Sequence, residues 1–146
     1  KKYYNIGIAV DIEGGLVVPV IKRAETQDIF QVAKNIQELA EKARTRTLDM
    51  MDLKGGTFTI TNIGIIGGTH ATPIINYPEV AILATGQIRE KPVVRDNRIV
   101  IRKILPLSLS FDHRVLDGAE AARFVTDLIK LLESPREIRL EGEQGF

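Results

Sequence analysis

His113 and Asp117 stand four residues apart in the stretch SLSFDHRVLDGAEAARF, residues 108–124, and their types would suit acid–base chemistry. Histidine is the side chain whose ordinary pKa lies nearest to neutral pH, so it can act as a general base. A structural alternative competes, because Asp117 followed three residues later by Glu120 matches a capping box for a helix that begins near Gly118. A histidine and an aspartate at this spacing are a weakly specific signal, which by itself favours the cap over catalysis.

The first half of the chain predicts a hairpin, a helix and a strand. The runs YNIGIAVDI and GLVVPVIK, joined at EGG, are typical of two strands around a glycine turn. Apolar residues at three- and four-residue spacing predict a helix over 28–43, capped by Thr26 or Asp28. In GGTFTITNIG, Phe58 and Ile60 alternate with three threonines, so the threonines are expected on the opposite face of a strand.

The second half predicts further strands and a last helix. EVAILATGQI and NRIVIRKILPLSLSF are expected to form longer strands joined by a turn at RDN, and residues 119–133 return to helical spacing. Because strands and helices are mixed without regular alternation, the sequence predicts an α+β fold, a mixed sheet with helices packed on one face. Residues 1–146 are expected to form a single domain.

Composition excludes several functional classes. The formal net charge of +1 gives no indication of nucleic-acid binding, and no apolar run approaches the length of a membrane span. The chain has no cysteine, which is compatible with a reducing compartment, and its two histidines, His70 and His113, make a poor metal site. His70 is expected to be a loop residue. A chain that opens directly in a strand pattern is interpreted as part of a larger polypeptide.

The order of TFTITNIGIIGG, ATPIINYPEVAILATGQI and SLSFDHRVLDGA resembles the catalytic domain of dihydrolipoamide acyltransferases, the E2 components of 2-oxo acid dehydrogenase complexes. The resemblance covers almost the whole chain. It implies a chloramphenicol acetyltransferase-like fold that forms trimers, of which this chain would be the C-terminal part of the catalytic domain. It also implies acyl transfer between dihydrolipoamide and coenzyme A.

Roles for individual residues follow from this resemblance. His113 would be the general base that removes the thiol proton of coenzyme A, with its other nitrogen held by a backbone hydrogen bond. Thr61 would donate to the tetrahedral oxyanion, whereas Thr57 and Thr59 are better explained as a β-favouring polar face. Asp117 would orient the histidine loop and could also cap the helix. The positions implied to line the coenzyme A channel are Asp11, Thr61, Asn62, Gly86 and Ile88. Spacing alone leaves Asp11 equally open as a turn residue and Gly86 as a strand bulge.

The resemblance also implies cofactors, partners and a location. Coenzyme A would be a substrate, the lipoyl group would be carried on a separate domain, and no metal would be needed. The expected partners are two further copies in a homotrimer that assembles into a larger core, a lipoyl domain, and the E1 and E3 components through domains outside this chain. Nucleic acid and membrane are not expected partners. The expected location is the cytoplasm, or the mitochondrial matrix in a eukaryote.

Two alternatives remain open from the sequence. One is a chloramphenicol-type acetyltransferase that acts on a hydroxyl group, which the TITNIGIIGG and SLSFDHRVLDGA segments disfavour. The other is a non-catalytic core scaffold of the same fold, for which intact His113 and Thr61 would have no use. The acyl group, whether acetyl, branched-chain or succinyl, is not decided by these residues.

Overall fold

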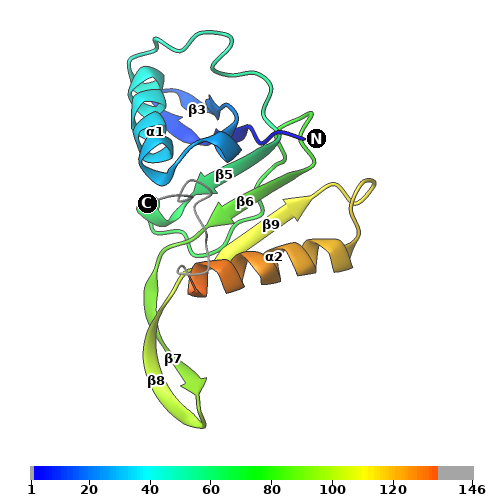
Figure 1. Ribbon diagram of the computed structural model, residues 1–146. Coiled ribbons are helices and arrows are strands. Elements are labelled where there is room, and N and C mark those ends of the chain that lie inside the picture. Colours follow the sequence, from blue (N-terminus) through cyan, green and yellow to red (C-terminus); the bar gives the residue numbers. More distant parts are fainter. Residues whose placement is uncertain (1, 135–146) are drawn as a thin grey trace, which may run out of the picture.

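The computed structural model describes residues 2–134, which form a mixed sheet, two long helices and a projecting hairpin (Figure 1). In chain order the strands are β1 (Ile6–Ile8), β2 (Val10–Ile12), β3 (Gly15–Val17), β4 (Val20–Ile21), β5 (Phe58–Asn62), β6 (Ala81–Thr85), β7 (Arg89–Arg95), β8 (Arg98–Ile104) and β9 (Leu107–Phe111). The helices are α1 (Ile29–Arg44) and α2 (Gly118–Glu133), with 3-10 turns at Ala24–Thr26 and Gly64–Ile66.

The main sheet has five strands in the order β4-β1-β5-β6-β9. Strands β1, β5 and β6 run parallel, whereas β4 and β9 are antiparallel to their neighbours. The carboxyl ends of β5 and β6 therefore meet at the end of the sheet where β9 begins. In Figure 1 the arrowheads of β5 and β6 lie at the left of the sheet, and the loop from β9 to α2 lies at its right.

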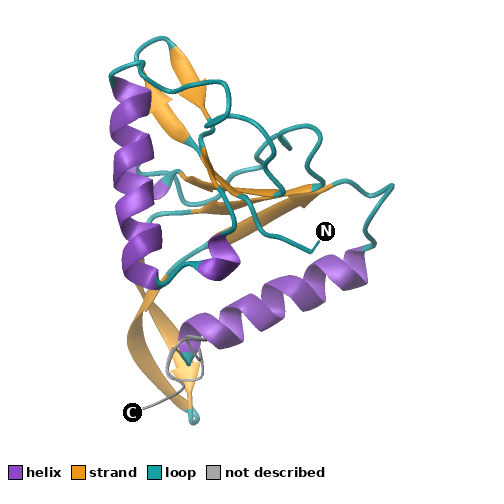
Figure 2. Cartoon of the chain, turned by 45° about the horizontal axis from the view of Figure 1, so that its top comes forward, coloured by secondary structure: helices purple, strands orange, loops and turns teal. Residues whose placement is uncertain are grey.

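Each long helix begins at a capping box. The Asp28 carboxylate accepts from the Gln31 amide at 2.8 Å and the Gln31 side chain accepts from the Asp28 amide at 2.9 Å, so Asp28 rather than Thr26 caps α1. Asp117 and Glu120 repeat this arrangement at the start of α2. These bonds satisfy amides that a helix start otherwise leaves unpaired, so the predicted cap at Asp117 is confirmed. Figure 2 shows both long helices in purple.

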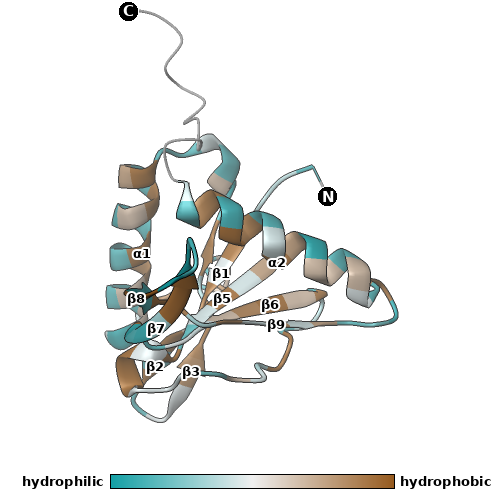
Figure 3. Cartoon of the chain, turned by 90° about the horizontal axis from the view of Figure 1, so that it is seen from below, coloured by the Kyte–Doolittle hydropathy of each residue, from teal (hydrophilic) through white to brown (hydrophobic). Residues whose placement is uncertain are grey.

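Both helices lie along the same side of the main sheet, as Figure 3 shows. Phe58 on β5 meets Phe124 on α2 with ring centroids 5.7 Å apart, which fixes the face of β5 that looks toward the helices. Because side chains alternate along a strand, Thr59 and Thr61 point to the opposite face, as expected. The most deeply buried apolar side chains are that of Pro19, just before β4, and those from β4, β6 and the two helices: Val20, Ile21, Ala43, Ala81, Ile82, Leu83, Ala84 and Ala121. The α+β prediction with helices on one face is confirmed.

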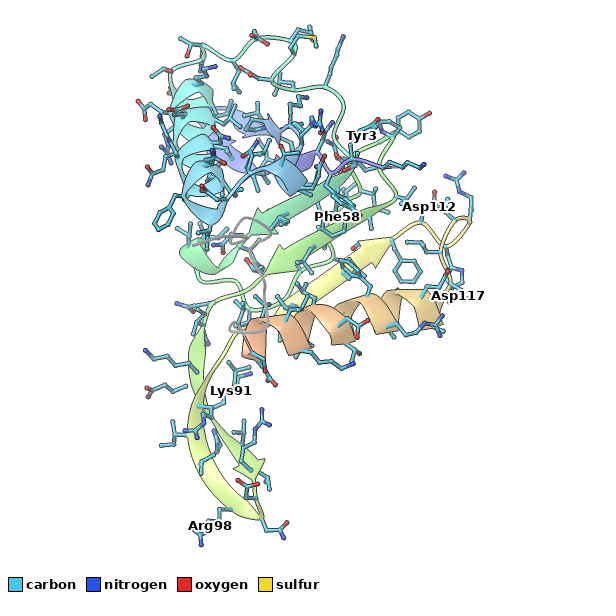
Figure 4. All side chains as sticks on the ribbon, in the orientation of Figure 1. Tyr3, Phe58, Lys91, Arg98, Asp112 and Asp117 are labelled. Atoms are coloured by element: carbon cyan, nitrogen blue, oxygen red, sulfur yellow. The ribbon has the colours of Figure 1, made fainter. Side chains whose placement is uncertain are left out.

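The long strand expected through NRIVIRKILPLSLSF is divided in two. The turn at RDN is present, with Asp96 and Asn97 in the left-handed region at φ 50° and 57°, and it joins β7 to β8 as a hairpin. Pro106, which has no amide hydrogen, stands between β8 and β9, and its carbonyl accepts from the Gly86 amide at 2.9 Å. Strands β7 and β8 pair with each other outside the main sheet, and Figure 4 labels Lys91 and Arg98 on this projecting hairpin.

Candidate active site

Thr61 lies near the carboxyl end of β5, on the face of the sheet that points away from the helices. It is paired with Ala84 of β6, which is paired in turn with Ser108 near the start of β9. The side chain is half-buried. A hydroxyl in this position can donate a hydrogen bond without changing its protonation state, which suits stabilisation of an oxyanion.

His113 lies in the loop that follows β9, where its side chain is exposed. Its ring packs against Phe111 with centroids 5.5 Å apart at a tilt of 37°. Among residues 2–134 no hydrogen-bond partner of its ring nitrogens is present, so the backbone bond that the family resemblance implies is not seen in the isolated chain. An exposed imidazole is free to meet a group from outside the chain.

Thr61 and His113 lie at opposite ends of the sheet. Ser108 shares the cross-strand row of Thr61, and His113 follows five residues later along β9 and its loop. At about 3.4 Å per residue, with two strand spacings of about 4.8 Å between β5 and β9, the two residues are roughly 15–20 Å apart. Neither side chain can span that separation, so one chain does not bring the predicted base and oxyanion donor together.

The Asp117 side chain caps the start of α2. Its carboxylate accepts from the Glu120 amide at 2.7 Å, and its own amide donates to the Glu120 carboxylate at 3.1 Å. These bonds anchor the far end of the loop that carries His113. The role of Asp117 as a helix cap is directly observed, and its carboxylate makes no direct contact with the His113 ring among the hydrogen bonds of residues 2–134.

The residues implied to line the coenzyme A channel gather at the Thr61 end of the sheet. The Ala9 amide donates to the Ile60 carbonyl at 3.0 Å, so the chain after β1 still runs beside β5 near this end of the sheet. Asp11, exposed on β2, follows two residues later and lies beyond that end. Gly86 follows β6 directly, and Ile88 is 58% exposed two residues later. The positions implied by the resemblance therefore lie at one end of the sheet, and the fold separates them from His113.

A cavity of about 340 Å³ opens in this region. Its lining residues come from the ends of β5 and β6, the 3-10 turn and the linker to β9: Asn62, Gly64, Ile65, Thr85, Gly86, Gln87, Ile88 and Leu105. Asn62 and Thr61 are successive residues of β5 and so point to opposite faces, and the Asn62 side chain also accepts from the Gly64 amide at 2.8 Å. Of the positions implied to line the channel, Asn62, Gly86 and Ile88 line this cavity, whereas Thr61 points to the other face of the sheet.

Asp112 and Arg114, which flank His113, form a bidentate ion pair that sequence reasoning did not single out. Arg114 Nη2 donates to Asp112 Oδ2 at 2.6 Å and Nε donates to Oδ1 at 2.9 Å. Hydrogen bonding from the Arg114 side chain and then from its backbone amide lowers the pKa of the Asp112 carboxyl to about 2, and the pair raises the pKa of Arg114. The signal available in the sequence was an acidic residue before the histidine and a basic residue after it.

Glu79 is a second residue that the sequence did not indicate. It is 7% exposed, and its carboxylate accepts a hydrogen bond of 2.6 Å from the hydroxyl of Thr59, which is completely buried. Thr59 was interpreted as part of a polar face, but it is a buried donor to a carboxylate. The available signal was a charged residue directly before the apolar run of β6.

Residues 2–134 contain no group of three or more histidine, aspartate or glutamate side chains arranged to hold a metal ion. Over the same residues, no helix has the length and apolar character needed to cross a membrane. His70 is exposed in a loop, as predicted.

Residues 1–140 match the family of 2-oxoacid dehydrogenases acyltransferase catalytic domains. The chain belongs to this family. It is 50% identical over 142 residues to the dihydrolipoyllysine-residue acetyltransferase component of the pyruvate dehydrogenase complex of Staphylococcus aureus, covering 97% of this chain and 33% of that protein. The acyltransferase chain thus spans about a third of the length of this curated relative.

Two solved structures are close in fold to this acyltransferase chain. One is the dihydrolipoamide acetyltransferase of Azotobacter vinelandii and the other is the cubic core of a pyruvate dehydrogenase multienzyme complex. Each aligns with a TM-score of 0.91 and 48% identity, over 93% of this chain and 56% of the other.

In the Azotobacter vinelandii enzyme, a serine, a histidine and an asparagine were investigated for their role in the catalytic mechanism. Those residues are separated by 52 and four positions, the same separations that relate Thr61, His113 and Asp117. At these separations the present chain has threonine, histidine and aspartate.

Proposed function

We propose that this chain, residues 1–146, is the C-terminal part of an E2 catalytic domain that transfers an acyl group between dihydrolipoamide and coenzyme A. The observation that carries the proposal is the set of spacings shared with the catalytic residues studied in the Azotobacter vinelandii acetyltransferase, on a chain of the same family. His113 occupies the histidine position, Thr61 the serine position and Asp117 the asparagine position.

Each residue has a defined part in the proposed reaction. The coenzyme A thiol is largely protonated near neutral pH, so His113 removes that proton as the sulfur attacks the acyl carbonyl. The attack places negative charge on the carbonyl oxygen, which Thr61 stabilises by donating its hydroxyl hydrogen. Asp117 holds the loop of His113 at the start of α2. The acyl group arrives as a thioester of the dihydrolipoyl group, which is bound on another domain. When the tetrahedral intermediate collapses, the bond from the acyl carbon to the dihydrolipoyl sulfur breaks, and that sulfur takes the proton held by His113.

We further propose that the active site is shared between subunits of a trimer. His113 and Thr61 are too far apart to act in one chain, whereas a head-to-tail contact in a closed ring would set the His113 end of one sheet against the Thr61 end of the next. Coenzyme A would enter past Asn62, Gly86 and Ile88, which line a cavity at the Thr61 end, with Asp11 on the exposed β2 strand beside it. The lipoyl arm would enter from the other end of the boundary.

The larger assembly and the remaining partners belong to the same proposal. The solved relative described as a cubic core supports assembly of such trimers into a larger core. E1 and E3 components and the lipoyl domain would interact through parts of the protein outside this chain.

Acetyl is the proposed acyl group, because the similar relatives are acetyltransferases. The test uses the full-length assembled protein with acetyl-, isobutyryl-, isovaleryl- and succinyl-coenzyme A in parallel, and dihydrolipoamide as the acceptor. The highest kcat/KM is expected for the acetyl donor. A preference for another donor would reject acetyl and keep the reaction class, whereas transfer to free alcohols but not to dihydrolipoamide would favour an O-acetyltransferase. No transfer to either acceptor would favour a non-catalytic scaffold.

A further inference from the structure

The backbone of Asp112 fixes the start of the loop that carries His113. Its amide donates to the Val80 carbonyl at 2.8 Å, which extends the pairing of β9 with β6 by one step. Its carbonyl accepts from the amides of Val115 at 3.0 Å and Leu116 at 3.1 Å. The chain therefore makes a tight turn around His113, anchored to the sheet at Asp112 (Figure 4).

The carboxylate of Asp112 holds the other side of the same turn. Oδ1 accepts from the Arg114 amide at 2.9 Å and from Arg114 Nε at 2.9 Å, and Oδ2 accepts from Arg114 Nη2 at 2.6 Å. The residues immediately before and after His113 are thus joined through backbone and side chain together. The lowered pKa of Asp112 keeps this carboxylate ionised throughout the neutral range.

We propose that Asp112 and Arg114 form a clamp that positions the His113 imidazole for proton transfer. The inference rests on the proposed function of His113 as the base. The clamp is needed because the imidazole is exposed and, among the described residues, no hydrogen bond holds its ring, which packs against Phe111. Proton transfer depends on distances of about 3 Å, and a displacement of about 1 Å can reduce a rate about a hundredfold.

Two other interpretations of the pair predict different results. An exposed ion pair can be without consequence, and the Arg114 side chain is 87% exposed. A guanidinium can also bind an anionic substrate group such as a phosphate of coenzyme A. The geometry favours the clamp over anion binding, since Nε and Nη2, one edge of the guanidinium fork, are both directed to Asp112.

The experiment compares Asp112→Asn and Arg114→Lys with Asp127→Asn in the full-length assembled protein. Asp127 is a matched control, because it forms an exposed ion pair of 3.0 Å with Lys130 on α2. Both clamp variants are expected to lower kcat about 10- to 100-fold while KM for coenzyme A stays within about twofold, since the base is misplaced but substrate contacts are kept. Wild-type kcat in both variants, or a raised KM with unchanged kcat, would overturn the clamp; the second result would indicate anion binding.

A second comparison repeats Asp112→Asn in a His113→Ala background. A residue that acts through the imidazole should have no further effect on the residual rate once the imidazole is gone, so the two losses should not add. A further loss of the same size as in the wild-type background would show a general structural effect and overturn the proposal.

Amide hydrogen exchange tests the clamp without reference to activity. Peptides covering residues 112–117 should exchange faster in Asp112→Asn than in wild type, and no faster in Asp127→Asn. Unchanged exchange would overturn the clamp even if transfer were impaired. If the wild-type protein had no transferase activity, the proposed function would fail while the exchange measurement still decided whether Asp112 holds the loop.

Discussion

Thr61 and His113 occupy opposite ends of one five-stranded sheet, although the sequence marks them as partners in one reaction. The parallel pairing of β5 with β6 and the antiparallel pairing of β6 with β9 produce this separation, because β9 carries the chain back past the start of β6 before His113 is reached. Each end of the sheet therefore carries half of the proposed catalytic set. A second copy of the chain is the simplest source of the missing half.

Replacement of His113 by alanine should abolish most acyl transfer and leave folding intact. The imidazole is exposed, so its loss creates no cavity, whereas loss of a general base typically costs about a hundredfold or more in rate. Turnover and thermal midpoint are measured on the assembled protein. His70→Ala is the matched control, since His70 is the other histidine of the chain and lies exposed in a loop. Turnover of His113→Ala within about threefold of wild type would refute the assignment.

The transfer rate of Thr61 variants should depend on whether the hydroxyl is kept rather than on the shape of the side chain. Thr61→Ser retains the donor and should be mild, whereas Thr61→Val is nearly isosteric but has no donor and should lose roughly a hundredfold or more in kcat. The two rate constants are compared at saturating substrates. Equal rates for Thr61→Val and wild type would show that this hydroxyl does not stabilise the oxyanion.

Gly86→Ala should destabilise the fold as well as narrow the cavity at the Thr61 end of the sheet. An added Cβ would collide with the Thr69 carbonyl oxygen, so backbone must shift, at a cost of about 1–3 kcal/mol. Gly118→Ala is the control, because a Cβ at Gly118 meets nothing within 4 Å and its position in α2 favours alanine. Thermal unfolding of both variants checks the ranking, and an unchanged midpoint for Gly86→Ala would contradict the close packing.

Thr59→Val should be more destabilising than its small change in shape suggests. The substitution removes the hydroxyl that donates to the buried Glu79 carboxylate at 2.6 Å, which leaves that acceptor without this bond at a cost of about 1–3 kcal/mol. Thr59→Ser keeps the hydroxyl and should retain most of the stability. Denaturant midpoints of the two variants are compared. A valine variant more stable than the serine variant would contradict a stabilising role for the hydroxyl.

Local elements of the fold could be predicted from local patterns. The capping box at Asp117, the alternation of Phe58 and Ile60 with threonines, and the turn at Asp96 and Asn97 depend on residues within a few positions of each other. For the first helix the sequence left Thr26 and Asp28 as alternative caps, and the structure has Asp28. The break between β8 and β9 was missed because both halves are β-favouring and Pro106 was not weighed against them. Local patterns could not predict the strand order, because the pairing of β6 with both β5 and β9 joins residues far apart in the sequence.

The sequence suggested residues for the candidate site but not their geometry. The motif that contains His113 and the strand that contains Thr61 are recognisable by type and order, yet their separation depends on strand order and direction. The pairing of Glu79 with Thr59 was also out of reach, because 20 residues lie between them in sequence and only the fold brings them together. Asp112 was visible beside His113, but its contacts with Arg114 depend on a turn that composition does not reveal.

A shared active site predicts that mixed oligomers of two inactive variants regain activity. Coexpression of a His113→Ala chain with a Thr61→Val chain should restore activity from two inactive parents, because some boundaries then join an intact histidine to an intact threonine. With random mixing in closed rings, about a quarter of the boundaries carry both residues, so about a quarter of wild-type activity is expected. Native mass spectrometry establishes that the oligomers are mixed. If the two residues acted within one chain, every site would keep one defect, and mixed oligomers without recovered activity would reject the shared site even with both residues essential.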